Sequence, residues 1–342
     1  MKLMNIFSTA LTVLTLAVSP ACSDDDSKEP QKAPTYDMTG FAKGADVSWV
    51  TEMEAAGYKW YNKAGGEREC LALMREMGMN SVRLRVWVDP AEGWSGKDDV
   101  LVKAWRARQL GFRIMIDFHY SDTWADPGSQ TVPAAWKDYD INRLRTAVAD
   151  HTREVLSALK ALDIDVEWVQ VGNETPDGFL WELGRASTHP ENFAALVNAG
   201  YDAVKEVYPN AVVIVHVDKG DNLGRHQKLF DILKNNGGKW DCIGMSLYPS
   251  DDDWETLTDN CLANISTLAS RYGCKVVIAE IGMPYDSPNA SAFVSRIYNG
   301  ARQLEPCLGV FYWEPECYNR EYIKGAFNSD GTPTDALDAF AW

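Results

Sequence analysis

Hydrophobic residues recur along this chain in short, nearly continuous runs that alternate with longer segments of helical periodicity. Eight of the runs are rich in β-branched residues and have the length of a strand. They are Ala42–Val47, Ser81–Val88, Arg113–Phe118, Glu167–Val171, Ala211–Val217, Cys242–Leu247, Lys275–Ala279 and Gly309–Tyr312. Strands that are apolar along their whole length are typical of parallel sheets covered on both faces.

The segments between these runs predict helices. In Asn142–Leu162 the apolar residues Leu144, Val148 and Val155 recur on one helical face. The other expected helices are Glu67–Met77, Lys97–Leu110, Glu191–Val207, Leu223–Asn235, Trp254–Tyr272 and Ser291–Leu304. Repeated strand–helix units without a Gly-rich dinucleotide fingerprint or a P-loop fit a closed barrel better than an open doubly wound sheet. We therefore predict one α/β domain, a single (β/α)8 TIM barrel over residues 37–342.

The N-terminus has the pattern of a targeting segment. Lys2 precedes the apolar run Ile6–Val18, whose 13 residues are too few for a helix that spans a membrane. Cys22 follows small residues after this run, which resembles a bacterial lipoprotein cleavage site. We predict a signal peptide over residues 1–21, with a lipidated Cys22 at the start of a flexible tether, residues 22–36. The alternative is a plain secretory signal with an incidental cysteine.

Charge and the first residues after Cys22 indicate location and partners. The acidic stretch Ser23–Asp26 resembles a signal that directs some bacterial lipoproteins to the cell surface. We therefore expect an extracytoplasmic, outer-membrane lipoprotein that faces outward and contacts the membrane through the lipid on Cys22. The net charge of −16, with no basic run, excludes nucleic acid as a partner. A monomer is expected.

Six further cysteines raise the question of disulfides, which an extracytoplasmic location permits. Cys307 and Cys317 flank the last strand and should lie roughly 30 Å apart, too far to pair. Cys242 and Cys274 both precede strands and could meet at one end of the barrel, although buried free thiols explain them equally well. No Cys or His spacing indicates zinc, and we predict no metal.

Two glutamates stand where catalytic residues of such a barrel belong, at the carboxyl ends of the strands. Glu174 ends the run Val169–Glu174 after the fourth strand, and Glu280 ends Val276–Glu280 after the seventh. An Asn173-Glu174 pair together with a second glutamate is what a retaining glycosidase needs, because one carboxyl acts as acid/base and the other as nucleophile. Either glutamate alone would read as an ordinary surface residue.

At these residues the chain resembles glycoside hydrolase family 53, the endo-β-1,4-galactanases, over about residues 40–342. The motifs that carry the resemblance are Gly44–Ser48, Val82–Trp87, Asp117–Gly128, Val171–Glu174, Gly178–Trp181 and Gly309–Pro315. The resemblance implies retaining, internal hydrolysis of β-1,4-galactosidic bonds in galactan or type I arabinogalactan, the side chains of pectin. This polysaccharide is the expected partner.

Two places depart from the family pattern. Val88 stands where relatives usually carry Asn, and Ile281–Met283 follows Glu280 in place of the usual Thr-Ala-Tyr type of run. These departures support a related retaining β-glycanase that acts on another hexan. A surface glycan-binding lipoprotein without catalysis is the alternative of another class, and the presence of both glutamates argues against it.

The resemblance also assigns roles. It makes Glu174 the acid/base, Glu280 the nucleophile, and Asn173 a partner of the sugar 2-hydroxyl. Arg83 and Arg85 lie on the same face of the second strand, so either could hold Glu280 ionised. We favour Arg83, because the earlier residue lies deeper beneath the barrel mouth.

Six further residues complete the expected substrate site. Tyr248 is expected to hydrogen-bond Glu280, with a core tyrosine as the alternative. Trp124 and Trp313 are candidates for stacking on sugar rings. His119 and His216 would contact sugar hydroxyls or orient carboxylates, and Asp117 ends the third strand beside them.

No cofactor is predicted. Some bacterial relatives hold a structural calcium ion near the loop after the eighth strand. Between Trp313 and Gly325 this chain has no acidic, Gly-containing run of calcium ligands. Asn328–Gly331 is more simply a turn, so a calcium site is not predicted.

Overall fold

The strands of the protein close into a parallel barrel. This computed structural model describes residues 36–341. Each strand pairs with the next in the order β1, β4, β5, β6, β7, β8, β9, β10, and β10 pairs again with β1. The bounds are β1 Ala42–Asp46, β4 Ser81–Val86, β5 Arg113–Phe118, β6 Trp168–Val171, β7 Val212–Val217, β8 Cys242–Leu247, β9 Lys275–Ile281 and β10 Cys307–Trp313. The predicted (β/α)8 architecture is confirmed.

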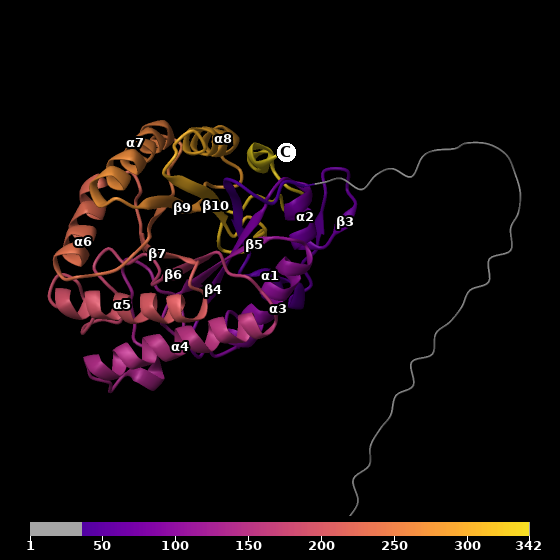
Figure 1. Ribbon diagram of the computed structural model, residues 1–342. Helices are drawn as coiled ribbons and strands as arrows, with labels where there is room; N and C mark the ends of the chain where they lie inside the picture. The colour runs from indigo at the N-terminus through magenta and orange to yellow at the C-terminus, as the bar shows by residue number, and fades with distance from the viewer. Residues whose placement is uncertain (1–35, 342) are drawn as a thin grey trace, which may run out of the picture. The chain divides into compact units, whose positions relative to one another are not determined.

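Helices surround the barrel and cover the outer face of its sheet (Figure 1). They are α1 Val50–Ala55, α2 Cys70–Glu76, α3 Lys97–Gln109, α4 Ile141–Ala161, α5 Pro190–Val207, α6 Leu223–Asn235, α7 Trp254–Tyr272 and α8 Ala290–Ala301, with short 3-10 helices η1 Ala134–Trp136 and η2 Asp335–Phe340. In α4 the predicted apolar face is buried, including Leu144, Val148 and Val155. The helix begins after Asp140, whose carboxylate accepts a hydrogen bond from the backbone N–H of Arg143 at 2.9 Å.

The prediction of one helix over Glu67–Met77 is wrong at its start. Residues Trp60–Tyr61 (β2) and Glu67–Arg68 (β3) form an antiparallel hairpin, and α2 begins after Glu69. The Asn62 side chain accepts the N–H groups of Ala64 and Gly66, which fixes the turn of this hairpin. The sequence analysis also missed α1, which is too short for a periodicity to show.

Two strands near the site are longer than predicted. β9 continues to Ile281, so that Glu280 lies inside the strand and not beyond it. β10 runs from Cys307 to Trp313 and therefore includes the cysteine that was expected to precede it.

Alternation along the strands divides the barrel interior into an apolar and a polar layer. At the amino-terminal end, an apolar cluster fills the barrel: Ala42, Met115, Trp168, Ile214, Cys242, Val277 and Phe311. Two residues further along their strands, Met115 gives way to Asp117, Trp168 to Gln170 and Ile214 to His216, all of them buried. The apolar layer closes one end of the barrel, and the polar layer forms the floor of a site at the other.

The six cysteines of residues 36–341 are free thiols, so Cys242 and Cys274 do not pair. In the same part of the chain no helix is long and apolar enough to cross a membrane. The predicted signal peptide, the lipidated Cys22 and the tether before Tyr36 lie outside the described residues.

Candidate active site

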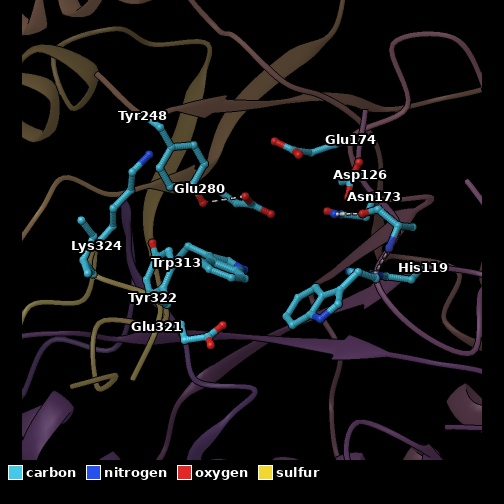
Figure 2. Close-up of a pocket in the computed structure, with 13 residues that line it drawn as sticks. His119, Asp126, Asn173, Glu174, Tyr248, Glu280, Trp313, Glu321, Tyr322 and Lys324 are labelled. Atoms are coloured by element: carbon cyan, nitrogen blue, oxygen red, sulfur yellow. Dashed lines mark hydrogen bonds between the residues drawn. The ribbon is translucent and has the colours of Figure 1, made fainter. Parts of the chain in front are cut away.

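A cavity of about 410 Å³ opens at the carboxyl ends of the barrel strands (Figure 2). Its lining comes from five sequence regions: His119 with Trp124–Asp126, Asn173 with Glu174, Tyr248, Glu280, and Trp313 with Glu321–Lys324. The cavity brings together seven of the ten residues expected at the substrate site. The other three, Arg83, Asp117 and His216, are fully buried beneath the cavity and do not line it. Trp124 and Trp313 form one wall of the cavity and contact Trp49.

The carboxyl groups of Glu174 and Glu280 point into the same space (Figure 2). Glu280 lies on the seventh barrel strand, β9, and Glu174 follows the fourth, β6. Burial raises the pKa of both carboxyls, and the charge of Glu280 raises that of Glu174 further, so that it stands well above its usual value. The two carboxyl groups together therefore favour a state with a single negative charge.

Of the two carboxyl groups, that of Glu280 contacts a hydrogen-bond donor and a cation directly. Its Oε2 accepts a hydrogen bond from the Tyr248 hydroxyl at 2.7 Å, and its Oε1 lies 2.9 Å from Nη2 of Arg83. Burial raises the pKa of Glu280 to about 7, while Arg83 and Tyr248 act to lower it. The expected contact between Tyr248 and Glu280 is confirmed, and so is the preference for Arg83 over Arg85.

Arg83 connects the carboxylates beneath the cavity. Its guanidinium contacts Asp46 at 2.6 Å, Asp117 at 2.8 Å and the Asn173 side-chain oxygen at 2.9 Å, besides Glu280. Burial alone would lower the pKa of Arg83, but the three carboxylates raise it. A permanently charged fork of donors therefore fixes both Glu280 and Asn173. Arg85, by contrast, pairs with Glu314, which follows β10.

A strained turn presents Glu174 to the cavity. Glu174 has a φ of 42°, a conformation that L-residues rarely adopt and that costs on the order of 1–3 kcal/mol. Gly172 before it has a φ of 85°, and a Cβ there would lie 2.8 Å from Thr175. The Gln130 amide donates to the carbonyl oxygens of Asn173 and Glu174, which holds the turn. The backbone that carries the Glu174 side chain is thereby fixed.

The two histidines beside the site are neutral, because burial lowers the pKa of both. His119 lines the cavity; its Nδ1 accepts the N–H groups of Trp87 and Ala125, so its Nε2–H donates to Asp117 at 3.1 Å. His216 lies below the cavity and contacts Asn173 and Ser246 instead.

Aromatic rings continue from the cavity along one wall. Trp49, Trp124 and Trp313 are in mutual edge contact, with ring centroids 5.3 to 5.8 Å apart. They border a neighbouring hollow of about 480 Å³ together with Arg320, Glu321 and Tyr322. Arg85 lies 4.3 Å beneath the centroid of Trp124 and supports this wall from inside the barrel.

Several residues of this site were not predicted from the sequence. Gln170, Ser246 and Trp49 follow the same strand-end pattern as the residues that were found, and alternation from Trp168 and Tyr248 points to the first two. Tyr322 and Lys324 belong to the loop after β10, where no periodicity indicates which side chains face inward.

The residues that depart from the family pattern do not line the cavity. Ile281 and Met283 are buried in the hydrophobic core and have no side chain in the cavity lining. Val88 borders a separate surface groove beside α4. The wall next to Glu280 is instead built by Tyr322–Lys324.

Within residues 36–341 no group of three or more His, Cys, Asp or Glu side chains is arranged to hold a metal ion. The segment around Asp330 is a turn, as predicted: the Asp330 carboxylate accepts both the N–H and the hydroxyl of Thr332.

Comparison with known proteins agrees with this geometry. The family model described as glycosyl hydrolase family 53 matches residues 42–340. The chain belongs to glycosyl hydrolase family 53. It is 33% identical over 298 residues to a probable arabinogalactan endo-β-1,4-galactanase A of Aspergillus terreus, covering 80% of this chain and 85% of that one. It is 30% identical over 307 residues to an endo-β-1,4-galactanase of Bacillus subtilis, covering 80% and 70%.

Solved structures of family 53 have the same fold. A structure from a study of two fungal β-1,4-galactanases superimposes with a TM-score of 0.82 at 29% identity, over 88% of this chain and 99% of that one. The family 53 catalytic domain of Ignisphaera aggregans gives a TM-score of 0.79 at 28% identity, over 88% and 95%.

Proposed function

We propose that the protein is a retaining endo-β-1,4-galactanase that cuts galactan and type I arabinogalactan. The observation that carries this proposal is the unequal environment of two carboxyl groups in one cavity. Glu280 has a cation and a phenol hydroxyl on its oxygens, whereas no cation of residues 36–341 lies within ion-pair distance of Glu174. One carboxyl is thus prepared to carry charge, and the other to carry a proton.

Glu280 is the nucleophile in this proposal. One of its oxygens attacks C1 of the sugar as Glu174 gives its proton to the departing glycosidic oxygen. Glu280 then has no charge, because it is bonded to the sugar. Glu174, now a carboxylate, takes a proton from water as the water oxygen bonds to C1 and Glu280 leaves as a carboxylate.

The buried residues beneath the cavity hold this arrangement. Arg83 keeps Glu280 charged in the free enzyme and fixes the side-chain oxygen of Asn173. The Asn173 amide nitrogen already donates to the carbonyl oxygen of Ala125 at 2.8 Å, which leaves its second hydrogen for a sugar hydroxyl. Asp117 and His216 act through these groups, since neither reaches the cavity surface.

The substrate follows from the family and from the cavity wall. The fungal and bacterial relatives above are named for β-1,4-galactan or arabinogalactan. The case for another hexan rested on Val88 and Ile281–Met283, and none of these residues lines the cavity. The tryptophan wall extends the binding surface beyond one sugar, as internal cutting of a polymer requires.

Purified galactan, β-glucan and β-mannan should be given separately to the soluble domain. Galactan should lose viscosity quickly and yield a ladder of oligosaccharides, with a rate that rises with chain length. Galactose released alone from the outset would contradict internal cutting. Faster hydrolysis of glucan or mannan would contradict the substrate, and binding without hydrolysis of any of them would indicate a glycan-binding protein.

We also propose that the enzyme is a monomeric, single-domain lipoprotein on the cell surface, after removal of residues 1–21. The support is the sequence pattern at Cys22 and Ser23–Asp26. Cys22→Ala should release the protein from the outer membrane. Replacement of the three aspartates at 24–26 by alanine should leave it anchored but hidden from surface labelling of intact cells. Unchanged labelling in both variants would refute this location.

A further inference from the structure

Ser246 lies beneath the cavity, with its hydroxyl beside the carboxyl group of Glu280. It lies on β8, opposite Glu280 in the pairing of β8 with β9, and it is 1% exposed. Its hydroxyl oxygen is 2.8 Å from Nε2 of His216 and 3.5 Å from Oε2 of Glu280. The same hydroxyl also interacts with Glu174 and acts to lower the pKa of that carboxyl, against the larger effect of burial.

The tautomer of His216 determines where the Ser246 proton points. Two N–H groups converge on Nδ1 of His216, the backbone N–H of Glu174 at 3.3 Å and the Gln170 side-chain amide at 2.9 Å. The Gln170 amide is fixed in this orientation, because its nitrogen also donates to Asp117 and its oxygen accepts from Arg83.

Nδ1 therefore accepts, and the proton of the neutral ring is on Nε2. Nε2–H donates to the oxygen of Ser246, so the hydroxyl proton of Ser246 is directed away from His216. The available acceptors are the carboxylates of Glu280 and Glu174. Asn173 Oδ1 also lies 3.0 Å from Nδ1; a proton on Nδ1 would donate to it and would turn the Ser246 proton toward His216.

We propose that Ser246 is a positioning residue whose hydroxyl proton follows the negative charge, from Glu280 in the free enzyme to Glu174 in the glycosyl-enzyme. The inference rests on the proposed function, because it assigns Ser246 to both steps of that reaction. Ser246 keeps its own proton throughout, and only the rotation about its Cβ–Oγ bond changes.

In each step of the proposed reaction one of the two carboxyl groups is charged, and the Ser246 hydroxyl can donate to it. Before bond cleavage Glu280 is the carboxylate and Glu174 holds the proton. When Glu280 bonds to C1 and Glu174 has given its proton to the leaving oxygen, the charge stands on Glu174. A hydroxyl with its lone pair fixed by His216 can rotate to the new charge without a new partner.

The test is the pH dependence of Ser246→Ala. The acid limb of kcat/KM reports Glu280 in the free enzyme. With an aryl glycoside whose deglycosylation limits turnover, the acid limb of kcat reports Glu174 in the intermediate. Loss of the Ser246 hydroxyl should move both acid limbs to higher pH, by about half a pH unit to one unit. Ser246→Thr, which keeps a hydroxyl, should return both limbs toward their original positions.

The other groups that face the two carboxyls are unchanged in these variants: Asp46, Arg83, Asp117, His216, Asp218, Tyr248 and Lys324. Ser81→Ala is the matched control. Ser81 is a buried strand serine whose hydroxyl donates to Asn80, away from the cavity. This control should move neither limb.

A shift of the kcat/KM limb alone would mean that Ser246 serves only Glu280, and would overturn the proposal. The proposal would also be overturned if a folded Ser246→Ala variant left both acid limbs in place. It would be overturned as well if a stable Ser246→Thr variant behaved like the alanine variant. The ¹⁵N shifts of His216 give a readout without substrate, and a proton on Nδ1 would also overturn it. If the wild-type protein hydrolyses no galactan but another glycoside, the proposed substrate fails while these tests remain decisive for Ser246.

Discussion

Tyr248→Phe removes one hydrogen bond from the proposed nucleophile and little else. The Tyr248 hydroxyl donates to Glu280 at 2.7 Å, and the ring keeps its place beneath the Lys324 ammonium, which lies 4.8 Å from the ring centroid. Phenylalanine retains the ring and its volume. The substitution thus isolates the effect of the hydroxyl on the pKa of Glu280.

A hydrogen bond to a charged group contributes about 1.5–3 kcal/mol, and one pKa unit corresponds to about 1.4 kcal/mol. If nothing replaced the hydrogen bond, the pKa of Glu280 would rise by about one to two units. Arg83 remains on Glu280, and Ser246 is near enough to take over part of the contact. We therefore expect a rise of about one unit. The sign follows from the charged form: the bond stabilises the carboxylate, so its loss raises the pKa from about 7.

The assay is kcat/KM on soluble galactan, measured across the pH range on both sides of neutrality. The acid limb should move to higher pH by about one unit, and well below that limb the variant should lose about tenfold. Tyr322→Phe is a matched control, since among residues 36–341 the Tyr322 hydroxyl has no hydrogen-bond partner although it lines the same cavity. An acid limb that stays in place in Tyr248→Phe, or moves equally in Tyr322→Phe, would refute the reasoning.

Three further predictions concern other residues of the cavity. Glu174→Ala should still form the glycosyl-enzyme from substrates with good leaving groups, and added azide should speed its turnover to a β-glycosyl azide; an α-azide would exclude the acid/base role. Lys324→Met removes a positive charge that interacts with Glu174. The pKa of Glu174 should rise, so the alkaline limb of kcat/KM should move to higher pH, while Lys324→Arg should leave it unchanged. Trp124→Ala should raise KM for long galactan about tenfold, a loss of roughly 1.4 kcal/mol, with a smaller effect on aryl glycosides; equal effects on both substrates would contradict a stacking role.

The strands and the catalytic end of the barrel could be predicted from the sequence because they follow a period of two. Arg83 and Asp117 each stand two residues beyond a strand position on the same face. Glu280 does not keep this period, because the pairing of β8 with β9 shifts register before it and the interior residue Val277 stands three residues earlier. The same rule would have identified Gln170, which follows Trp168 on β6. Side chains on regular strands have directions that the chain fixes locally.

Loops carry no such information. Lys324 and Tyr322 reach the cavity because the loop after β10 folds back over the barrel mouth, where the backbone N–H of Tyr285 donates to the carbonyl oxygen of Ile323 at 2.9 Å. That contact depends on tertiary structure, and the sequence around it has no period. Ile281 and Met283 differ from the family pattern but face the core, because a residue next to a catalytic strand end can face the core as readily as the substrate.

The hairpin of β2 and β3 lies where the start of α2 was predicted, and local sequence did not indicate it. Glu67 and Arg68 have ordinary helix propensities, and the Asn62 turn that pairs them with Trp60–Tyr61 precedes the apolar run. Turn chemistry therefore outweighed helix propensity here.

The measurement that tests the central claim most directly is the anomeric configuration of the first product. Proton NMR of galactan during the first turnovers should show the new reducing end as the β anomer, because attack by Glu280 and then by water inverts C1 twice. The β signal should then decay slowly to the equilibrium mixture. An initial α anomer would contradict the assignment of Glu280 as nucleophile and of Glu174 as the acid/base in a double displacement.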